Sequence, residues 1–400
     1  MKKVCTILCI ISILSLGVFA KSVWELGLGL TEIEDTYYGS FSFRPDIKVG
    51  KLGLGLSLTL HFNAQGLRLE DWQDNGNFSI TKSLARVVRY VSWAELGDPV
   101  YFRLGELSNV YVANGLIMDG YRNLSAYEIR SDIRKLGVDL AGDAGILGAH
   151  VMVNDALKPE LFVLHPYVRP LYFVDGIPGF LKNTSVGVVY ARDTRPAYKM
   201  PYAYGLDLTM PLLRNFVFYF HTAELANNSR GHAVGARSNL GPLYLRGEYR
   251  VYGEDFRPAV YDWQYEDYGT AMVLQSPKAN GYMAEAGFSL LQDNLYFNIR
   301  YDNMMIEGQD SVPTLTGRAV IGSDLFAAVT GRKGQLEASY SQLNFVKIGD
   351  FTNQRTKIDA AVSLELYRGL MGRYVYTVTF TENSTPVRFQ AFEVVLGGGF

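Results

Sequence analysis

Residues 51–62 (KLGLGLSLTLHF) carry a large apolar side chain at every second position and a small or polar residue between each pair. Side chains alternate between the two faces of a β-strand, so a strand here has one apolar face and one small or polar face. A helix would scatter the same leucines around its circumference, and its interior would hold unfavourable glycines. The segment is therefore a strand whose two faces meet different surroundings.

The same alternation recurs along the rest of the chain, and we find no convincing helix after residue 20. We expect an all-β chain of about 18–20 antiparallel strands. The twenty segments that carry the pattern are 22–31, 37–48, 52–62, 83–95, 100–107, 126–141, 146–154, 160–169, 184–193, 202–210, 216–225, 232–239, 243–252, 281–291, 295–303, 317–325, 335–345, 357–367, 373–381 and 387–400.

The connections between these strands alternate in length. Most even-numbered connections are short, as at 49–51 and 240–242, whereas the odd-numbered ones include the long stretches 63–82, 108–125 and 253–280. Short turns at one end and long loops at the other are typical of an outer-membrane barrel. Two even connections are longer than this pattern predicts and leave room for a miscounted pair of strands; they are 170–183 and 326–334.

Three observations indicate that the apolar faces meet lipid rather than a protein core. Eleven residues at about 3.3 Å each, tilted by about 40°, cover roughly 28 Å, which is close to the ~25 Å apolar band of a barrel. Aromatic residues gather near segment ends, as girdles at the bilayer interfaces do. The polar faces carry charges that a dry core would disfavour, such as Arg246, Glu248 and Arg250. We therefore expect residues 21–400 to form one transmembrane, antiparallel, up-and-down β-barrel.

The first twenty residues, MKKVCTILCIISILSLGVFA, resemble a secretory signal peptide cleaved near Lys21. The alternative is a membrane anchor, for which the apolar run is short. Both cysteines, Cys5 and Cys9, lie in this segment, so the mature chain is expected to hold no disulfide or thiolate metal site. It keeps 40 acidic residues and 36 basic ones (38 minus Lys2 and Lys3), and this near balance argues against a nucleic-acid partner.

The final strand alternates apolar residues and ends in an aromatic one; the relevant positions are Phe392, Val394, Leu396 and Phe400. This ending resembles the assembly signal of Gram-negative outer-membrane barrels, and the Gly and Tyr usage resembles spirochaetal outer-membrane proteins. The resemblance implies the cell outer membrane as location, and lipid and the barrel-assembly machinery as partners. The fatty-acid transporter family is a poorer match, because its N-terminal hatch and Asn-Pro-Ala element are missing.

A barrel of this size encloses a wide aqueous channel unless something fills it. The best candidate filler is 108–125, which is moderately apolar and contains turn signals at Asn114-Gly115 and Asp119-Gly120. It either folds inward as a constriction or forms an ordinary external loop. The apolar run at 116–118 favours the inward position.

Charged residues on the polar faces are the candidate pore lining. In 126–141 the charged positions and the later leucines share one parity, so we expect the faces to switch near Lys135 through a β-bulge. These charges either set up a transverse field that screens solutes or form ion pairs that stiffen the wall. With the two loop residues, the full candidate set is Arg103, Asn114, Asp119, Glu128, Arg130, Asp132, Arg134, Arg246, Glu248, Arg250 and Arg300.

In the loop 253–280, Tyr261, Trp263 and Tyr265 alternate with polar residues, which predicts a hairpin extended above the membrane. These aromatic residues are candidate external ligand contacts that could grip a sugar, although such a loop more often folds on itself.

Catalytic signals are weak. The five histidines show no metal-ligand spacing, no Gly-x-Ser-x-Gly motif is present, and no helix follows the paired glycines. We predict that the chain is not an enzyme and uses no metal or cofactor.

Our leading hypothesis is a porin-like outer-membrane channel for passive or weakly selective diffusion of small hydrophilic solutes. The alternative is a surface-exposed, adhesin-like or structural barrel with a plugged lumen and ligand-binding external loops. Inward charge on several strands favours the channel, and the aromatic loop favours the binder.

Overall fold

A computed structural model describes residues 21–33, 36–74, 77–78, 86–125, 134–195, 201–262, 265–268, 277–291, 294–308, 311, 313–347, 349–367, 370–380 and 385–398. The expected signal peptide, 1–20, lies outside these residues, so its cleavage stays a prediction.

Strands make up most of the described residues. The wall strands are β1 (Lys21–Ile33), β2 (Thr36–Val49), β3 (Leu52–Leu56), β4 (Leu58–Asn63), β8 (Val88–Trp93), β9 (Val100–Gly105), β10 (Gly137–Asp143), β11 (Leu147–Val153), β12 (Leu161–Val168), β13 (Ser185–Asp193), β14 (Tyr202–Leu213), β15 (Phe216–Leu225), β16 (Arg230–Leu240), β17 (Leu243–Tyr252), β18 (Ala279–Leu290), β19 (Leu295–Ile306), β20 (Thr314–Ile321), β21 (Gly334–Leu343), β22 (Thr356–Tyr367), β23 (Leu370–Phe380) and β24 (Pro386–Gly398). Short extra strands, β5 (Gly66–Leu67), β6 (Gln73–Asp74) and β7 (Asn77–Phe78), follow β4 with the 3-10 turn η1 (Leu69–Trp72).

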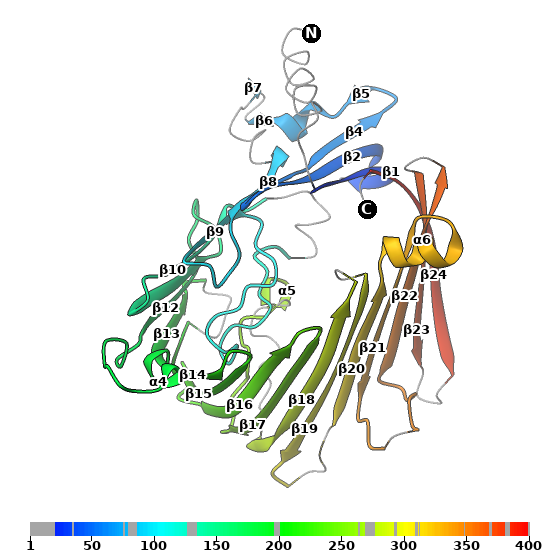
Figure 1. The fold of residues 1–400 in the computed structure, drawn as a ribbon. Coiled ribbons are helices and arrows are strands. Elements are labelled where there is room, and N and C mark those ends of the chain that lie inside the picture. Colours follow the sequence, from blue (N-terminus) through cyan, green and yellow to red (C-terminus); the bar gives the residue numbers. More distant parts are fainter. Residues whose placement is uncertain are drawn as a thin grey trace.

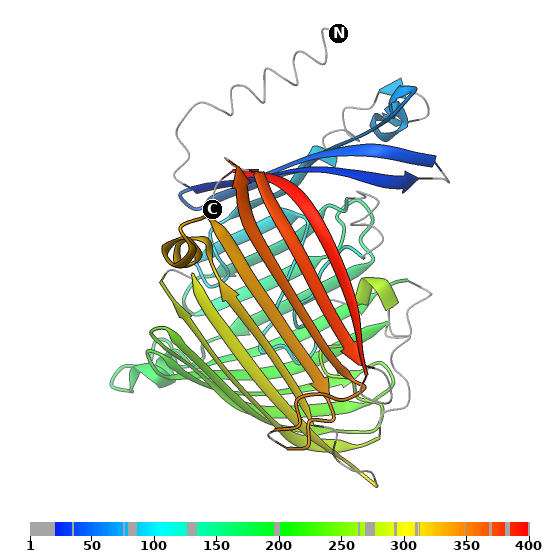
Figure 2. The same ribbon diagram turned by 90° about the vertical axis from the view of Figure 1, so that its right-hand side faces the viewer.

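Each wall strand pairs antiparallel with its neighbours in chain order (Figure 1). β1 pairs with β2 over thirteen residue pairs and with β24 over four, so the pairing returns to its first strand. With β3 and β4 counted as one strand, twenty described strands take part, and each overlaps one of the twenty expected segments. The prediction of an antiparallel up-and-down barrel is confirmed. Figure 2 shows the wall strands tilted and side by side, with β1 and β2 crossing their ends.

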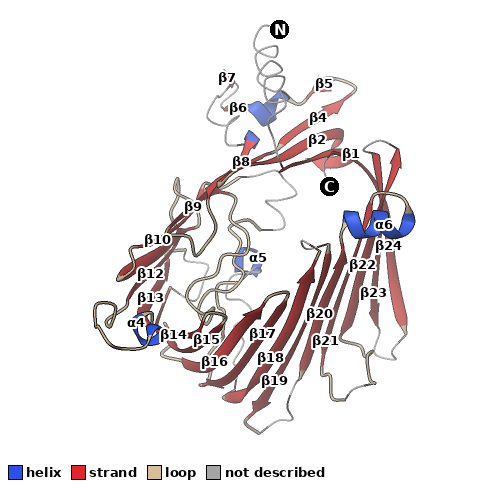
Figure 3. Cartoon of the chain, in the orientation of Figure 1, coloured by secondary structure: helices blue, strands red, loops and turns tan. Residues whose placement is uncertain are grey.

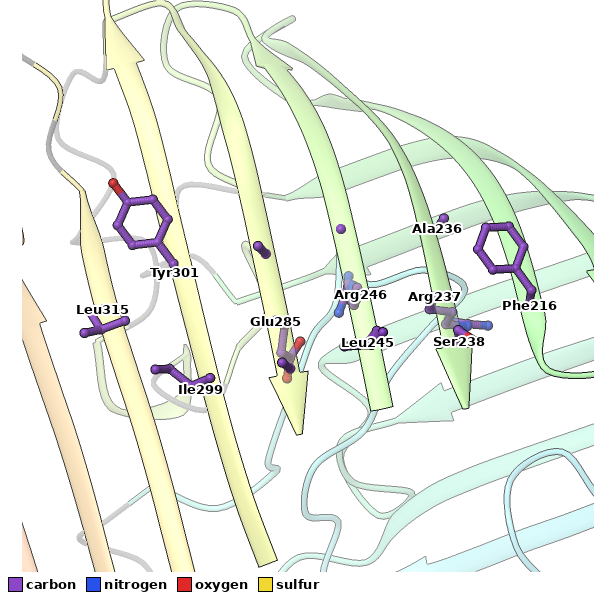
Figure 4. Close-up of a pocket in the computed structure, with 13 residues that line it drawn as sticks. Phe216, Ala236, Arg237, Ser238, Leu245, Arg246, Glu285, Ile299, Tyr301 and Leu315 are labelled. Carbon is purple, nitrogen blue, oxygen red and sulfur yellow. The ribbon is translucent and has the colours of Figure 1, made fainter. Parts of the chain in front are cut away.

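The two faces of the wall differ as the alternation predicted. On β17, Glu248 and Arg250 are buried, whereas Tyr249 and Val251, which alternate with them, are exposed. Apolar side chains of the outer face line a shallow groove of about 560 Å³ across β15–β20 (Figure 4). Leu245 and Ile299 belong to this groove. In a barrel this exposed apolar face is the one that meets lipid.

The segment 51–62 forms β3 and β4, with an irregularity between Gly55 and Leu56. Its small residues face inward and its leucines face outward, because a Cβ placed on Gly55 would lie 2.3 Å from the Tyr90 ring. The glycines therefore leave room for a tyrosine that packs across the inner face from β8, where its hydroxyl donates to Asp46 Oδ1 at 2.5 Å.

The two long even connections contain short helices instead of a strand pair. They are α4 (Gly179–Lys182) and α6 (Ser323–Thr330), so the expectation of no helix after residue 20 was wrong. Ala327 and Ala328 favour α6, and Gly331 ends it in the left-handed conformation at φ 74°. Among the described residues, no helix is long and apolar enough to cross a bilayer.

Candidate functional site in the lumen

Two loop segments that are far apart in the sequence meet inside the ring of strands (Figure 3). The backbone N–H of Ala259 donates to the Leu116 carbonyl at 2.8 Å, and that of Tyr261 donates to the Ile117 carbonyl at 3.1 Å. Met118 and Tyr261 form a parallel β-bridge. We call this unit the plug and define it as residues 107–124 with 256–262 and 265–266.

The plug packs against the inner face of one side of the barrel. The plug approaches the wall closely where the wall residue is small. At Gly205, an added Cβ would lie only 3.2 Å from the Ile117 Cδ1 atom of the plug. A larger side chain there would push the plug away from the wall. The buried cluster joins plug residues to wall residues of β11–β15 and β17, which are Met152, Leu161, Val163, Val189, Ala191, Ala203, Ala223, Leu225 and Tyr252.

A buried carboxylate anchors the plug to the wall. Glu266 accepts hydrogen bonds from the Tyr121 hydroxyl at 2.7 Å, Lys135 Nζ at 3.0 Å and Arg195 Nη1 at 2.9 Å. Burial and the neighbouring Glu266 charge raise the pKa of Tyr121 well above its usual value near 10. The hydroxyl therefore stays protonated and keeps donating.

The external aromatic loop takes a different position from the expected one. Tyr261 and Tyr265 are fully buried in the plug, and Tyr265–Tyr268 form the short helix α5 instead of one arm of a hairpin. Trp263 lies outside the described residues. The expected hairpin above the membrane was wrong because alternation shows that one face is apolar but not what covers it. Here the cover is the segment 116–118.

The inner face of β17–β19 carries a continuous chain of ion pairs, which we call the charged belt: Arg246, Glu248, Arg250, Asp302 and Arg300. Arg246 pairs with Glu248, whose other oxygen accepts from Arg250 Nε at 2.6 Å. Arg250 Nη1 reaches Asp302 Oδ1 at 2.7 Å, and Arg300 Nε reaches Asp302 Oδ2 at 2.6 Å. The belt unites four predicted lining residues in one array with one surplus positive charge.

Sequence reasoning missed Asp302, which shares the strand and the parity of Arg300 and could have been found by that signal. It also missed Tyr219, Arg237 and Glu285. The Tyr219 hydroxyl donates to Glu248 Oε1 at 2.6 Å. Arg237 and Glu285 stand directly across from Arg246 on the two neighbouring strands.

The tip of the plug touches the belt. Asn114 Nδ2 donates to Thr209 Oγ1 at 3.1 Å, and the backbone carbonyl of Asn114 accepts from Arg246 Nη2 at 3.4 Å. The backbone N–H of Asp119 donates to the Tyr261 carbonyl at 3.2 Å. Both loop candidates therefore belong to the plug, and Asn114 stands next to the belt.

Arg103 and Arg134 belong to a separate cluster near β8 and β9. The Arg103 guanidinium stacks 3.8 Å from the Tyr90 ring centroid, and Arg134 Nη2 donates to Ser57 Oγ at 3.0 Å. Residues 134–136 precede β10 and are not in a strand, so the expected strand start and bulge near Lys135 were wrong for the described part. Glu128, Arg130 and Asp132 lie outside the described residues.

Three histidines pair with aspartates. His150 Nε2 lies 2.5 Å from Asp139 Oδ1, and His165 Nε2 lies 2.8 Å from Asp207 Oδ2. His61 pairs in the same way with Asp71. Within the described ranges, no group of three or more His, Cys, Asp or Glu residues could hold a metal ion.

On β24, the Phe392 side chain is 65% exposed and stands opposite Tyr374. The backbones of Val394 and Leu396 follow in the same strand, and Phe400 lies outside the described residues. A role of these residues in assembly stays a prediction.

A ring of tilted antiparallel strands with an apolar outer face and a charged inner face is now established. The fold is that of a porin-like outer-membrane β-barrel. Neither a family model nor a curated protein matches the sequence. Among solved structures, this porin-like barrel is similar to Pseudomonas aeruginosa OpdO, with TM-score 0.38 and 10% identity over 95% of each chain.

Two further solved structures show the same kind of similarity. Pseudomonas aeruginosa OpdK, solved with vanillate, gives a TM-score of 0.36 and 9% identity over 95% of this chain and 97% of that one. The second is Wzi, a carbohydrate-binding β-barrel involved in group 1 capsule assembly in Escherichia coli. It gives a TM-score of 0.38 and 10% identity over 98% of this chain and 87% of that one.

Proposed function

We infer that this porin-like barrel is an outer-membrane channel through which small hydrophilic solutes pass beside the plug and along the charged belt. The belt is the observation that carries this proposal. The two belt residues on β19 keep contact with solvent, since the Arg300 side chain is 33% exposed and that of Asp302 is 21% exposed. Charges on an inner wall are tolerated where water reaches them and disfavoured in a dry core.

The proposal includes two further steps. Residues 1–20 act as a signal peptide that directs export and is then cleaved, and the barrel-assembly machinery recognises β24. Oppositely charged groups held at fixed positions would order water and select solutes by charge and size. The ion pairs also stiffen the wall, so the two roles considered for these charges are compatible.

The plug supports a second candidate, a barrel with a blocked lumen that binds ligands at its surface. Its buried cluster covers the inner face of β11–β15 and β17. Two of the aromatic residues proposed for such binding, Tyr261 and Tyr265, are themselves buried there.

Conductance in planar bilayers separates the two candidates. A channel gives stable single-channel currents with the full-length, folded protein, and deletion of 109–122 raises them. A protein that is folded by heat-modifiable gel mobility and never conducts would rule out the channel. Unchanged conductance after the deletion would show that the plug does not narrow the path.

A further inference from the structure

A cavity of about 420 Å³ opens on the inner face of β16–β19, where β16 turns into β17. Tyr111 of the plug covers it from one side, and Tyr244 of β17 and Tyr296 of β19 line its wall. The volume lies at the lower end of the ~300–1,000 Å³ range of small-molecule sites. The cavity uses only wall and plug residues, so it lies within the proposed solute path.

The polar residues of the cavity supply both donors and acceptors. Arg237 Nη1 donates to Asn114 Oδ1 at 3.5 Å. Glu285 accepts from Asn298 Nδ2 at 2.9 Å. Two guanidiniums (Arg237 and Arg246), one carboxylate and two amides thus share one cavity with three phenol rings.

This mixture favours a ligand without net charge. The charge of Arg246 is already paired with Glu248, which leaves Arg237 and Glu285 as the opposed charges of the cavity. An anion attracted by Arg237 would also face Glu285, and a cation attracted by Glu285 would also face Arg237. Hydroxyl groups both donate and accept, so they can satisfy all of these side chains. Phenol rings add flat apolar surfaces that cover the C–H faces of a ring-shaped polyol.

We propose that this cavity is a binding site for a neutral polyhydroxylated solute of one or two sugar rings. Tyr111, Tyr244 and Tyr296 cover its apolar faces, and Arg237, Glu285 and Asn298 hydrogen-bond its hydroxyls. The proposal rests on the lumen being open to solutes, and it names the class of solute that this site selects.

Binding is measured by titration calorimetry on the full-length protein folded in detergent micelles. The probes are maltose, succinate, putrescine and glycine. Maltose binds saturably, and Arg237→Ala and Tyr244→Ala each weaken it about tenfold or more, because each removes a hydrogen bond or a stacking surface. Two matched controls leave the affinity unchanged. Glu337→Gln changes a lumen-facing acid outside the cavity, and Tyr249→Ala changes a lipid-facing tyrosine of the same strand.

Heat-modifiable mobility of every variant shows that it is folded. The proposal is overturned if maltose does not bind, if succinate, putrescine or glycine binds more tightly than maltose, or if the control variants lose affinity equally. Conductance is recorded on the same preparations. Maltose binding without conductance would reject the channel and keep the site, whereas conductance without maltose binding would reject the site and keep the channel.

Discussion

Glu266 balances the charges at the centre of the plug. Its carboxylate lies 3.0 Å from Lys135 Nζ and 2.9 Å from Arg195 Nη1, and only about 2% of its side chain is exposed. Arg195 keeps a second partner in Asp193, whereas Glu266 is the carboxylate that joins the two loop segments. Glu266 is therefore the buried acid that links the two plug segments beside their backbone and apolar contacts.

Replacing Glu266 with glutamine should destabilise the plug by about 3–5 kcal/mol, because Lys135 and Arg195 lose a buried counter-charge. The expected results are a lower urea midpoint and faster cleavage of the plug by trypsin. Glu254→Gln, on an exposed part of the same loop, is the control and should match the parent protein. Equal stability of the Glu266 variant would show that the plug is held by its apolar contacts alone.

The alternation of wall strands could be predicted from the sequence because it depends on neighbours two residues apart. The plug could not be predicted in the same way, because Tyr121 and Glu266 are 145 positions apart and Leu116–Met118 find their cover on another loop. Local patterns report that a face is apolar but not which distant segment meets it. The belt lay between these cases, since parity identified Arg246, Glu248, Arg250 and Arg300 as inward-facing but neither singled out Asp302 nor showed how the five residues pair.

On β22, adjacent residues face different surroundings, which are water in the lumen and lipid outside the barrel. Ala361 stands across from Glu337 on the inner face, and Val362 stands across from Tyr374 on the outer face. Val362→Lys should cost about 2–4 kcal/mol if it lies near the bilayer midplane, and it should reduce folding into lipid vesicles. Ala361→Lys should fold normally, because its ammonium group faces water and Glu337. Heat-modifiable gel mobility measures both, and equal folding of the two variants would contradict the assignment of the faces.

The plug should weaken at high pH. Tyr121 has a raised pKa, so its hydrogen bond to Glu266 stabilises the plug fully below the unfolded pKa near 10, and this stabilisation declines as the pH rises from there toward the higher folded pKa. Bilayer conductance should therefore stay constant from pH 7 to about 10 and increase above that range. Tyr121→Phe removes the ionisable hydroxyl and should reduce the rise. A parent conductance that does not change up to pH 11.5 would argue against this linkage.

At the scale of the whole molecule, the seam between β1 and β24 is short. Leu26 and Leu396 stand directly opposite each other within its four residue pairs. Opposed residues of antiparallel strands have Cα atoms about 4.5–5.5 Å apart, which suits a disulfide. Both native cysteines lie in the first nine residues, so an engineered pair would be unambiguous once that segment is removed.

The double variant Leu26→Cys/Leu396→Cys should form an intramolecular disulfide after oxidation, visible as a mobility change on a non-reducing gel. The cross-linked barrel should unfold at a higher urea concentration, since the bridge closes almost the whole mature chain into one loop. Leu26→Cys with Val375→Cys, whose strand does not pair with β1, should not cross-link. Failure of the first pair in folded protein would contradict the seam.

The plug also divides the barrel mechanically. Side chains of β11–β15 and β17 pack against the plug. In the described region, β20–β24 are held to their neighbours mainly by the backbone hydrogen bonds of the sheet. Bending stiffness rises steeply with thickness. The wall that packs on the plug is therefore stiff, and the single-layered wall of β20–β24 is more flexible. Thermal motion would then change the shape of the aperture by bowing of one wall, with the belt at the boundary between the two sides.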